Sequence, residues 1–332
     1  MIKIEGDRCH AVLIDQLQPI LAYDKGADYS VWKKEIREKL AQLLGDMPPL
    51  RPVSVQVEYE RRMDGYTETR FVYESEENCL VPAYLLVPEG TEKYPVAVCL
   101  QGHSTGMHIS LGIKKYEGDE KLFPSQTHAL NAVKNGCAAL VIEQRGMGER
   151  RSPLTLDDRF ATSTALLLGR TIIGERVWDI SRGIDALQYF AGAGAGLDLS
   201  RIVCLGNSGG GTATYYAAAT DERISLAVVS CALCSYKDSI GAVYHCGCNY
   251  IPGALKWFDM GDLACLIAPR KLIVAAGEKD EIFPLQGVKK IMKTVGAVYE
   301  HEGASQNLRF IQTDKAHWFS HELIWPAIRE ML

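Results

Sequence analysis

One short segment constrains the fold of this 332-residue chain more than any other. An apolar run over 202–205 is followed by Gly206-Asn207-Ser208-Gly209-Gly210 and then by small residues that suit a helix. This is the G-x-S-x-G pattern of a serine carried on a sharp turn between a strand and a helix. The turn strains its central residue, so Gly206 and Gly210 are expected to give the space that lets strand and helix approach closely. The Ser208 hydroxyl would then be exposed at the carboxyl edge of a sheet.

A base and an acid are needed as well, because serine alone is a weak nucleophile. Asp280 follows an apolar run over 271–276, and His317 follows another over 308–311. Both runs are typical of buried strands, so both residues are expected in loops at the edge where Ser208 lies. The chain order serine, acid, histidine is the order of α/β-hydrolases. We therefore expect Ser208 to attack, His317 to act as the base and Asp280 to orient the imidazole.

Other acids and histidines compete for these roles, namely Glu278, Glu281, His301 and His321. The two glutamates are interpreted as solvated loop charges, because the Gly-x-x-Asp-x-x-x-Pro spacing favours Asp280. His321 is expected on the C-terminal helix and His301 ahead of the last strand, so neither is well placed to act as the base.

An oxyanion hole requires backbone donors near the serine. One donor is expected from the Gly209 amide, directly after the nucleophile. The second is expected from the loop 101–106, which follows a predicted strand over 95–100. We assign it to the amide of His103, with Gly102 permitting the turn. The His103 side chain is given no role beyond packing.

Composition indicates a globular protein and limits the kinds of partner that the chain is expected to bind. The chain is 47% hydrophobic and 23% charged, as in globular proteins, and its net charge of −5 favours neither nucleic acid nor an anionic membrane. Residues 1–10 contain no apolar signal-peptide core, and no apolar run reaches the ~20 residues of a membrane span. A cytoplasmic protein acting on a small-molecule ester is expected, without a metal or another cofactor. The oligomeric state is not predicted.

Five metal-ligating side chains lie close together in the sequence and imitate zinc spacing: Cys231, Cys234, His245, Cys246 and Cys248. Cys231, however, closes an apolar strand over 224–230, and the set lies inside the predicted catalytic core. These cysteines are therefore expected to pack as small hydrophobic residues rather than to form a zinc site or disulfides.

The order of elements predicts an α/β architecture. Apolar spacing over 29–44 predicts an amphipathic helix, which makes residues 1–50 an N-terminal helical arm and residues 51–332 the catalytic domain. Three antiparallel strands are expected first, over 53–59, 67–73 and 81–87. Strands and helices then alternate, with helices over 125–134 and 175–190, which indicates a mostly parallel, doubly wound sheet. The glycine-rich stretches 191–196 and 145–151 are interpreted as a loop and a salt-bridged turn rather than as nucleotide-binding motifs.

The segment 206–210, the turn that carries Asp280 and the loop that bears His317 resemble the α/β-hydrolase superfamily. Within it, Glu-Gln-Arg-Gly-Met-Gly at 143–148 resembles the Asp-x-Arg-Gly-x-Gly turn of acetyl xylan esterases, and 169–179 resembles esterases near that group and dienelactone-hydrolase-like proteins. The likeness runs from about residue 30 to the C-terminus. Three departures stand out. Gln101 replaces a common histidine, Glu143 replaces the usual aspartate, and the nucleophile is serine rather than the cysteine of dienelactone hydrolase.

Two segments interrupt the regular alternation and are expected to cover the sheet edge, namely 103–123 and 152–168. The substrate pocket is expected to draw on Met107, Trp178, Ile282, Phe283 and Trp318. The first segment carries many charges, which argues against a lipase that works on an oil interface. The expected function is hydrolysis of short-chain, acetyl-type esters through an acyl-enzyme. An amide hydrolase or peptidase, and a non-catalytic binding protein on a hydrolase fold, are the alternatives.

Overall fold

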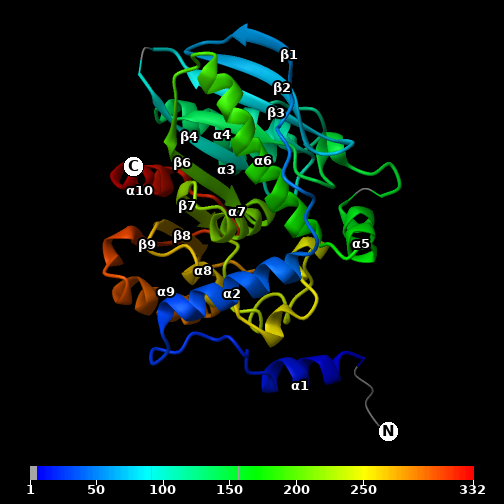
Figure 1. The fold of residues 1–332 in the computed structure, drawn as a ribbon, viewed down its shortest axis with the longest axis vertical. Helices are drawn as coiled ribbons and strands as arrows, with labels where there is room; N and C mark the ends of the chain where they lie inside the picture. Colours follow the sequence, from blue (N-terminus) through cyan, green and yellow to red (C-terminus); the bar gives the residue numbers. More distant parts are fainter. Residues whose placement is uncertain (1–5, 91, 156) are drawn as a thin grey trace.

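The fold is built around one nine-stranded sheet with helices on both faces (Figure 1). A computed structural model describes residues 6–90, 92–155 and 157–332, so half of the segment 1–10 discussed above, and residue 156 of the segment 152–168, lie outside the described residues. The strands are β1 Val55–Arg62, β2 Tyr66–Glu76, β3 Cys79–Pro88, β4 Tyr94–Leu100, β5 Ala138–Ile142, β6 Leu197–Asn207, β7 Ile224–Ser230, β8 Lys271–Gly277 and β9 Leu308–Thr313. The helices are α1 Arg8–Gln16, α2 Tyr29–Leu44, α3 Phe123–Gln126, α4 His128–Lys134, α5 Arg159–Leu167, α6 Ile172–Gly192, α7 Gly209–Thr220, α8 Met260–Cys265, α9 Leu285–His301 and α10 His321–Met331.

The strand order is β1-β2-β3-β5-β4-β6-β7-β8-β9. The first three strands pair antiparallel with one another, and β3 pairs antiparallel with β5. From β5 to β9 all neighbours are parallel, with β6 in the middle of this half. The predicted architecture of antiparallel strands followed by a mostly parallel sheet is therefore confirmed, and the loops after β6, β8 and β9 share one edge.

Alternating side chains of the central strands feed two separate hydrophobic cores, as the pleat requires. In β4, Val96, Val98 and Leu100 point to the core that contains α2, α6, α7, α8 and α9. Ala97 and Cys99 point to the other core, with α4 and α10. Each strand is thus buried on both faces, which explains why these strands read as continuous apolar runs.

Two predicted helices differ from those observed, for local reasons. The helix expected over 125–134 is split into α3 and α4, because Thr127 adopts a non-helical backbone (φ −76°, ψ 56°). The helix expected from residue 175 begins at Ile172, because the Thr171 hydroxyl caps it by accepting a hydrogen bond from the Gly174 amide at 3.1 Å. None of the helices in the described ranges has the length and apolarity needed to span a bilayer.

Candidate active site

The turn between β6 and α7 holds Ser208 in a strained conformation. Its φ is 55° and its ψ is −124°, outside the regions that ordinary residues adopt. A β-carbon at Gly206 would lie 2.4 Å from the Gly210 carbonyl carbon, and one at Gly210 would lie 2.1 Å from the Leu100 oxygen. Both contacts are impossible, so the close approach of strand and helix demands glycine at each position, as predicted.

An acid–base pair lies at the same edge of the sheet. His317, in the loop after β9, has its Nδ1 2.9 Å from Oδ2 of Asp280, in the loop after β8. The other oxygen of Asp280 accepts hydrogen bonds from the amides of Ile282 (2.9 Å) and Phe283 (3.1 Å). Burial raises the pKa of Asp280, but His317 and these two amides outweigh it and hold that pKa below its usual value.

The histidine ring is supported on one face and accessible to solvent. Phe283 stacks on His317 with ring centroids 6.0 Å apart and planes 14° apart. The His317 side chain remains 25% exposed. Its Nδ1 faces Asp280, so its Nε2 is free to exchange a proton with a nucleophile.

The order of the strands brings Ser208 to the same edge of the sheet as the Asp280–His317 pair. Its amide donates to the Ser230 carbonyl at the end of β7 (2.9 Å), and the next residue, Cys231, lies within 4.8 Å of the Asp280–His317 pair. Among the described residues, no hydrogen bond joins the Ser208 hydroxyl to His317. The serine, the imidazole and the acid thus share one edge of the sheet, with the serine–histidine contact unmade in this structure.

Three of the four competing residues are placed elsewhere or engaged by other partners. Glu278 binds the Gln312 side chain on the surface, His301 ends α9 against the Tyr29 ring, and His321 opens α10 with its Nδ1 bound to Trp325.

The predicted oxyanion loop lies against the nucleophile. A β-carbon at Gly102 would be 3.4 Å from the Ser208 β-carbon, and the Gly102 amide donates to Gln126 at 3.3 Å. Gly209 is the first residue of α7, where amides have no partner inside the helix. The amides of Gly209 and His103 therefore remain candidates for the two donors.

A buried carboxylate lies beneath this loop, and its partners were not predicted from the sequence. Glu143 accepts hydrogen bonds from the Gln101 side chain (3.0 Å) and from the Met107 and Glu149 amides (3.1 and 3.2 Å). Burial raises its pKa to about 7. The departures at 101 and 143 are thus partners of each other, which only the folded chain reveals.

The His103 side chain also has partners that its sequence position did not indicate. Its Nε2 lies 3.3 Å from the Cys248 sulfur and 3.4 Å from Oδ2 of Asp158. The same Asp158 oxygen accepts a hydrogen bond from Arg176, at 2.9 Å. Segments far apart in the chain therefore converge behind the nucleophile, and sequence spacing alone gives no signal of it.

The predicted pocket residues divide into two groups. Ile282, which is 39% exposed, and Phe283 lie beside the Asp280–His317 pair, and Trp318 follows His317 directly. Met107 is buried in the core that contains α4 and α10. Trp178 donates to the Ser75 carbonyl of β2 at 2.8 Å and faces Arg182, so its contacts do not bring it to Ser208.

The zinc-like set separates in the folded chain. Cys231 lies beside Asp280, the Cys234 sulfur contacts the Pro284 carbonyl, His245 meets Ser239, and Cys248 meets His103. All ten cysteines are free. Two groups of donor atoms are compact, His103–Asp158–Cys248 and Cys231–Asp280–His317, but each contains a histidine already paired with its acid, so we assign no metal to either.

The arginine-rich turn after β5 is an ion-pair network, as predicted. Arg145 binds Asp179 at 2.9 Å and Glu76 at 2.5 Å, and Arg150 binds Asp179 at 2.6 Å. These charges fix the turn against α6 and β2.

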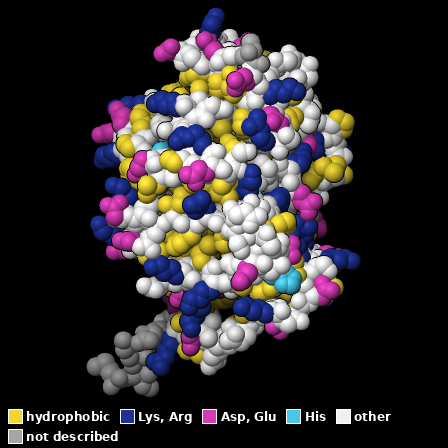
Figure 2. Space-filling model, turned by 90° about the vertical axis from the view of Figure 1, so that its left-hand side faces the viewer, with side chains coloured by type: hydrophobic (Ala, Val, Ile, Leu, Met, Phe, Trp, Pro, Cys, Tyr) yellow, Lys and Arg dark blue, Asp and Glu magenta, His cyan; other side chains and the backbone are white. Residues whose placement is uncertain are grey.

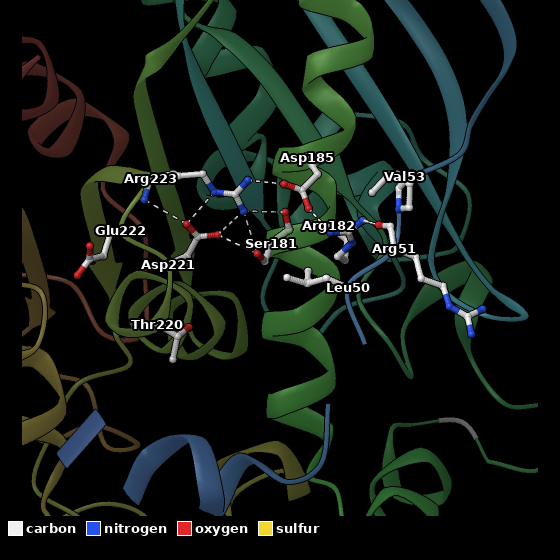
Figure 3. A pocket seen from close by; sticks show the side chains of 11 residues that line it. Leu50, Arg51, Val53, Ser181, Arg182, Asp185, Thr220, Asp221, Glu222 and Arg223 are labelled. Atoms are coloured by element: carbon white, nitrogen blue, oxygen red, sulfur yellow. Dashed lines mark hydrogen bonds and ion pairs between the residues drawn. The ribbon is translucent and has the colours of Figure 1, made fainter. Parts of the chain in front are cut away.

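A further pocket lies at the opposite end of α7 (Figure 3). Its lining includes Thr220, which ends the helix that Ser208 begins, so about 18 Å of helix separates the two. The Arg223 guanidinium in this pocket is already bound by Asp185, Asp221 and Ser181. The other two arginines of the described lining are also ion-paired, Arg51 with Glu77 and Arg182 with Asp185. The pocket belongs to a different part of the molecule from Ser208.

One face of the molecule carries a mixture of surface charges. On the described part of one face, Lys and Arg side chains are interspersed with Asp and Glu (Figure 2). Such a mixture provides no extended field of one sign to steer a polyanion.

Comparison with known proteins agrees with this fold. A family model described as "Abhydrolase family" matches residues 8–162, which include the predicted oxyanion loop but end before Ser208. The chain is 30% identical over 308 residues to "Putative hydrolase YtaP" of Bacillus subtilis (strain 168), covering 90% of this chain and 98% of that protein.

Solved structures share the fold at low identity. A "putative acetyl xylan esterase" from Bacteroides fragilis NCTC 9343 superposes with a TM-score of 0.80 at 17% identity, over 100% of this chain and 96% of the other. A glucuronoyl esterase from Solibacter usitatus superposes with a TM-score of 0.71 at 15% identity, over 95% and 97%.

Proposed function

The chain belongs to the α/β-hydrolase superfamily, in the family that includes the hydrolase-named Bacillus relative, and on this premise we propose that it is a serine carboxylesterase acting on short-chain, acetyl-type esters. The observation that carries the proposal is the 2.9 Å contact between His317 and Asp280 at the sheet edge where Ser208 occupies its strained turn. A strained serine beside an oriented imidazole is the arrangement that acyl transfer requires.

The reaction proceeds in two halves. In the first, the Ser208 oxygen bonds to the acyl carbon while its proton passes to Nε2 of His317. The tetrahedral intermediate collapses by breaking the bond to the alcohol, which leaves with the proton from His317. In the second, His317 takes a proton from water, the resulting hydroxide bonds to the acyl carbon, and Ser208 departs with its proton restored. Ester and water thus become carboxylic acid and alcohol.

Asp280 acts throughout by fixing the imidazole. Its carboxylate accepts a hydrogen bond from Nδ1–H of His317, which leaves Nε2 as the basic nitrogen for the serine. It also stabilises the imidazolium that forms when His317 takes a proton. The low pKa of Asp280 keeps the carboxylate charged at neutral pH.

The segment that is expected to cover the site favours short acyl groups over lipid substrates. The segment 103–123 contains charged side chains that bind one another, such as Lys114 with Glu120, and Lys115 with Glu149 at 3.6 Å. Such a surface does not insert into lipid. The fold neighbours named as carbohydrate esterases make acetylated sugars the first substrates to test.

The test compares wild type with Ser208→Ala on p-nitrophenyl acetate. We expect kcat to fall about 10⁴-fold or more, because a catalytic nucleophile is removed. Labelling of Ser208 by a fluorophosphonate in the wild type, and its absence in the variant, gives an independent readout. Near-wild-type turnover by Ser208→Ala would refute the proposal, and a preference for anilides over esters would favour an amide hydrolase.

A further inference from the structure

The ring of His103 lies against the residue that follows the nucleophile. A β-carbon at Gly209 would be 2.5 Å from the ring carbon Cε1 and 2.6 Å from Nδ1, so the Cε1–Nδ1 edge occupies the space beside that backbone. The His103 side chain is 27% exposed. The Cε1–Nδ1 edge of the imidazole therefore lies beside Gly209, the residue whose amide is the candidate oxyanion donor.

The other ring nitrogen has two partners. Nε2 lies 3.4 Å from the Asp158 carboxylate and 3.3 Å from the Cys248 sulfur, and both of these partners are buried. An ionised carboxylate can only accept a hydrogen bond, so Asp158 favours a proton on Nε2. Donation at Nδ1 then requires the ring to carry both protons and a positive charge.

The surroundings balance that charge. Asp158 pairs with the buried guanidinium of Arg176 at 2.9 Å, which leaves the Cys248 sulfur as the other group beside Nε2 of His103. Cys246 also raises the pKa of the ring, and His245 is a nearby group that opposes its charge. A doubly protonated His103 would be balanced by a negative charge on Cys248, with Arg176 balanced by Asp158.

The electrostatics agree with this charge assignment. Burial lowers the pKa of His103, but the Cys248 charge and the hydrogen bond to Asp158 outweigh it and raise that pKa well above the usual value. Burial likewise raises the pKa of Cys248, but His103 and Arg176 bring it below its usual value. The pKa of Asp158 is lowered to about 2 by His103 and Arg176 against the effect of burial.

We propose that the His103 side chain is a catalytic residue that donates a hydrogen bond from Nδ1 to the oxyanion, with Cys248 and Asp158 as its positioning residues. The inference rests on the proposed esterase function and deepens it. An oxyanion hole would then combine a charged side chain with the backbone amide of Gly209, and a charge-assisted hydrogen bond is stronger than a neutral one.

A second histidine on the same loop provides a matched control. His108 is paired with Asp119 at 3.0 Å, as His103 is paired with Asp158, but its neighbours are Thr105 and Tyr116 rather than Gly209. Replacing it tests whether loss of any paired histidine on this loop impairs the enzyme.

The experiment measures kcat and KM on p-nitrophenyl acetate for His103→Ala, Cys248→Ser and His108→Gln. For His103→Ala we expect kcat to fall about 10²–10³-fold with KM nearly unchanged, as when one oxyanion donor is lost. Added imidazole should restore part of the rate. His108→Gln should stay within about threefold of wild type, since an uninvolved side chain adds little to the barrier. Melting temperatures check that each variant is folded.

The pH dependence of kcat in Cys248→Ser tests the positioning role of Cys248. The wild type should lose kcat as the pH rises through the pKa of His103, because the imidazolium is then lost. Serine keeps a hydroxyl but not the thiolate, so this loss should begin at lower pH in the variant. A purely structural role of Cys248 would change the rate without moving the profile.

Two outcomes would overturn the inference. One is a His103→Ala variant that retains kcat within about threefold of wild type. The other is an equal loss in His108→Gln, which would assign the effect to the loop as a whole. Either result leaves the esterase proposal intact as long as Ser208→Ala is inactive, whereas an active Ser208→Ala would refute the esterase itself.

Discussion

At the scale of single residues, Asp280 is the group whose replacement separates the orientation of His317 from its basicity. Asp280→Asn keeps the size of the side chain and one oxygen, but the amide can present N–H to Nδ1 and so favour the wrong tautomer. We expect kcat for p-nitrophenyl acetate to fall about 10⁴-fold with KM little changed.

The neighbouring acid supplies the control for that substitution. Glu281→Gln removes the same charge one residue along the loop, and we expect its kcat to match wild type. Equal activity of Asp280→Asn and wild type would assign the role of the acid to another residue. Equal losses in both variants would indicate that loop charge, rather than the hydrogen bond to His317, sets the rate.

From the sequence, the position of a site residue can be predicted where a simple topological rule determines it. Ser208, Asp280 and His317 each follow a strand of the parallel half of the sheet, so the rule that these loops share an edge predicts one edge for all three, and the structure shows Asp280 and His317 in contact there. The partners of Glu143 and Asp158 could not be predicted, because they come from segments that meet only in the folded chain. Charge and spacing give no signal for a convergence of that kind.

At the scale of elements, α8 connects the N-terminal segment to the sheet through one carboxylate. Asp262 accepts hydrogen bonds from the Tyr23 amide (2.9 Å) and from the Asp259 amide (2.8 Å), which closes a capping box. Burial raises the pKa of Asp262 to about 6. Its ionisation therefore opposes folding.

The sign of the pH dependence follows from that raised pKa. Between about pH 4 and pH 6 the folded chain keeps the Asp262 proton while the unfolded chain has released it, so this group makes folding less favourable as the pH rises. The quantity to compare is the free energy of unfolding of wild type minus that of Asp262→Asn. We expect this difference to decrease from pH 4 to pH 7, by on the order of 3 kcal/mol. Urea unfolding across this range measures it.

An exposed acid, Asp46, provides the control for the Asp262→Asn measurement. Asp46→Asn removes a carboxylate from the surface near the end of α2, and its stability curve should run parallel to that of wild type. Parallel curves for Asp262→Asn and wild type would show that Asp262 is ionised in the folded chain throughout this range.

At the scale of the whole molecule, helix α2 of the predicted N-terminal arm shares the core of the sheet domain. Helix α2 buries Tyr29, Trp32, Ile36, Leu40 and Leu44 in the same cluster as α6 to α9. The Leu44 carbonyl also accepts hydrogen bonds from the Thr171 amide and hydroxyl, at 3.0 and 2.8 Å. The amphipathic spacing predicted this helix correctly, but periodicity alone cannot say which surface covers its apolar face.

The two helices of the arm should therefore respond differently to truncation. Burial of five large side chains by α2 is worth roughly 10 kcal/mol, which is comparable to the whole stability of a typical domain. Helix α1 buries no side chain. Removal of residues 1–16 should leave the melting temperature within a few degrees of wild type and the esterase rate unchanged, since little apolar burial is lost. Removal of residues 1–50 should abolish cooperative unfolding in calorimetry.

The point variant Ile36→Ala, expected to lower the free energy of unfolding by about 2–5 kcal/mol, tests the same packing without truncation. A cooperative, active protein lacking residues 1–50 would show that the sheet and its remaining helices form a complete core without α2.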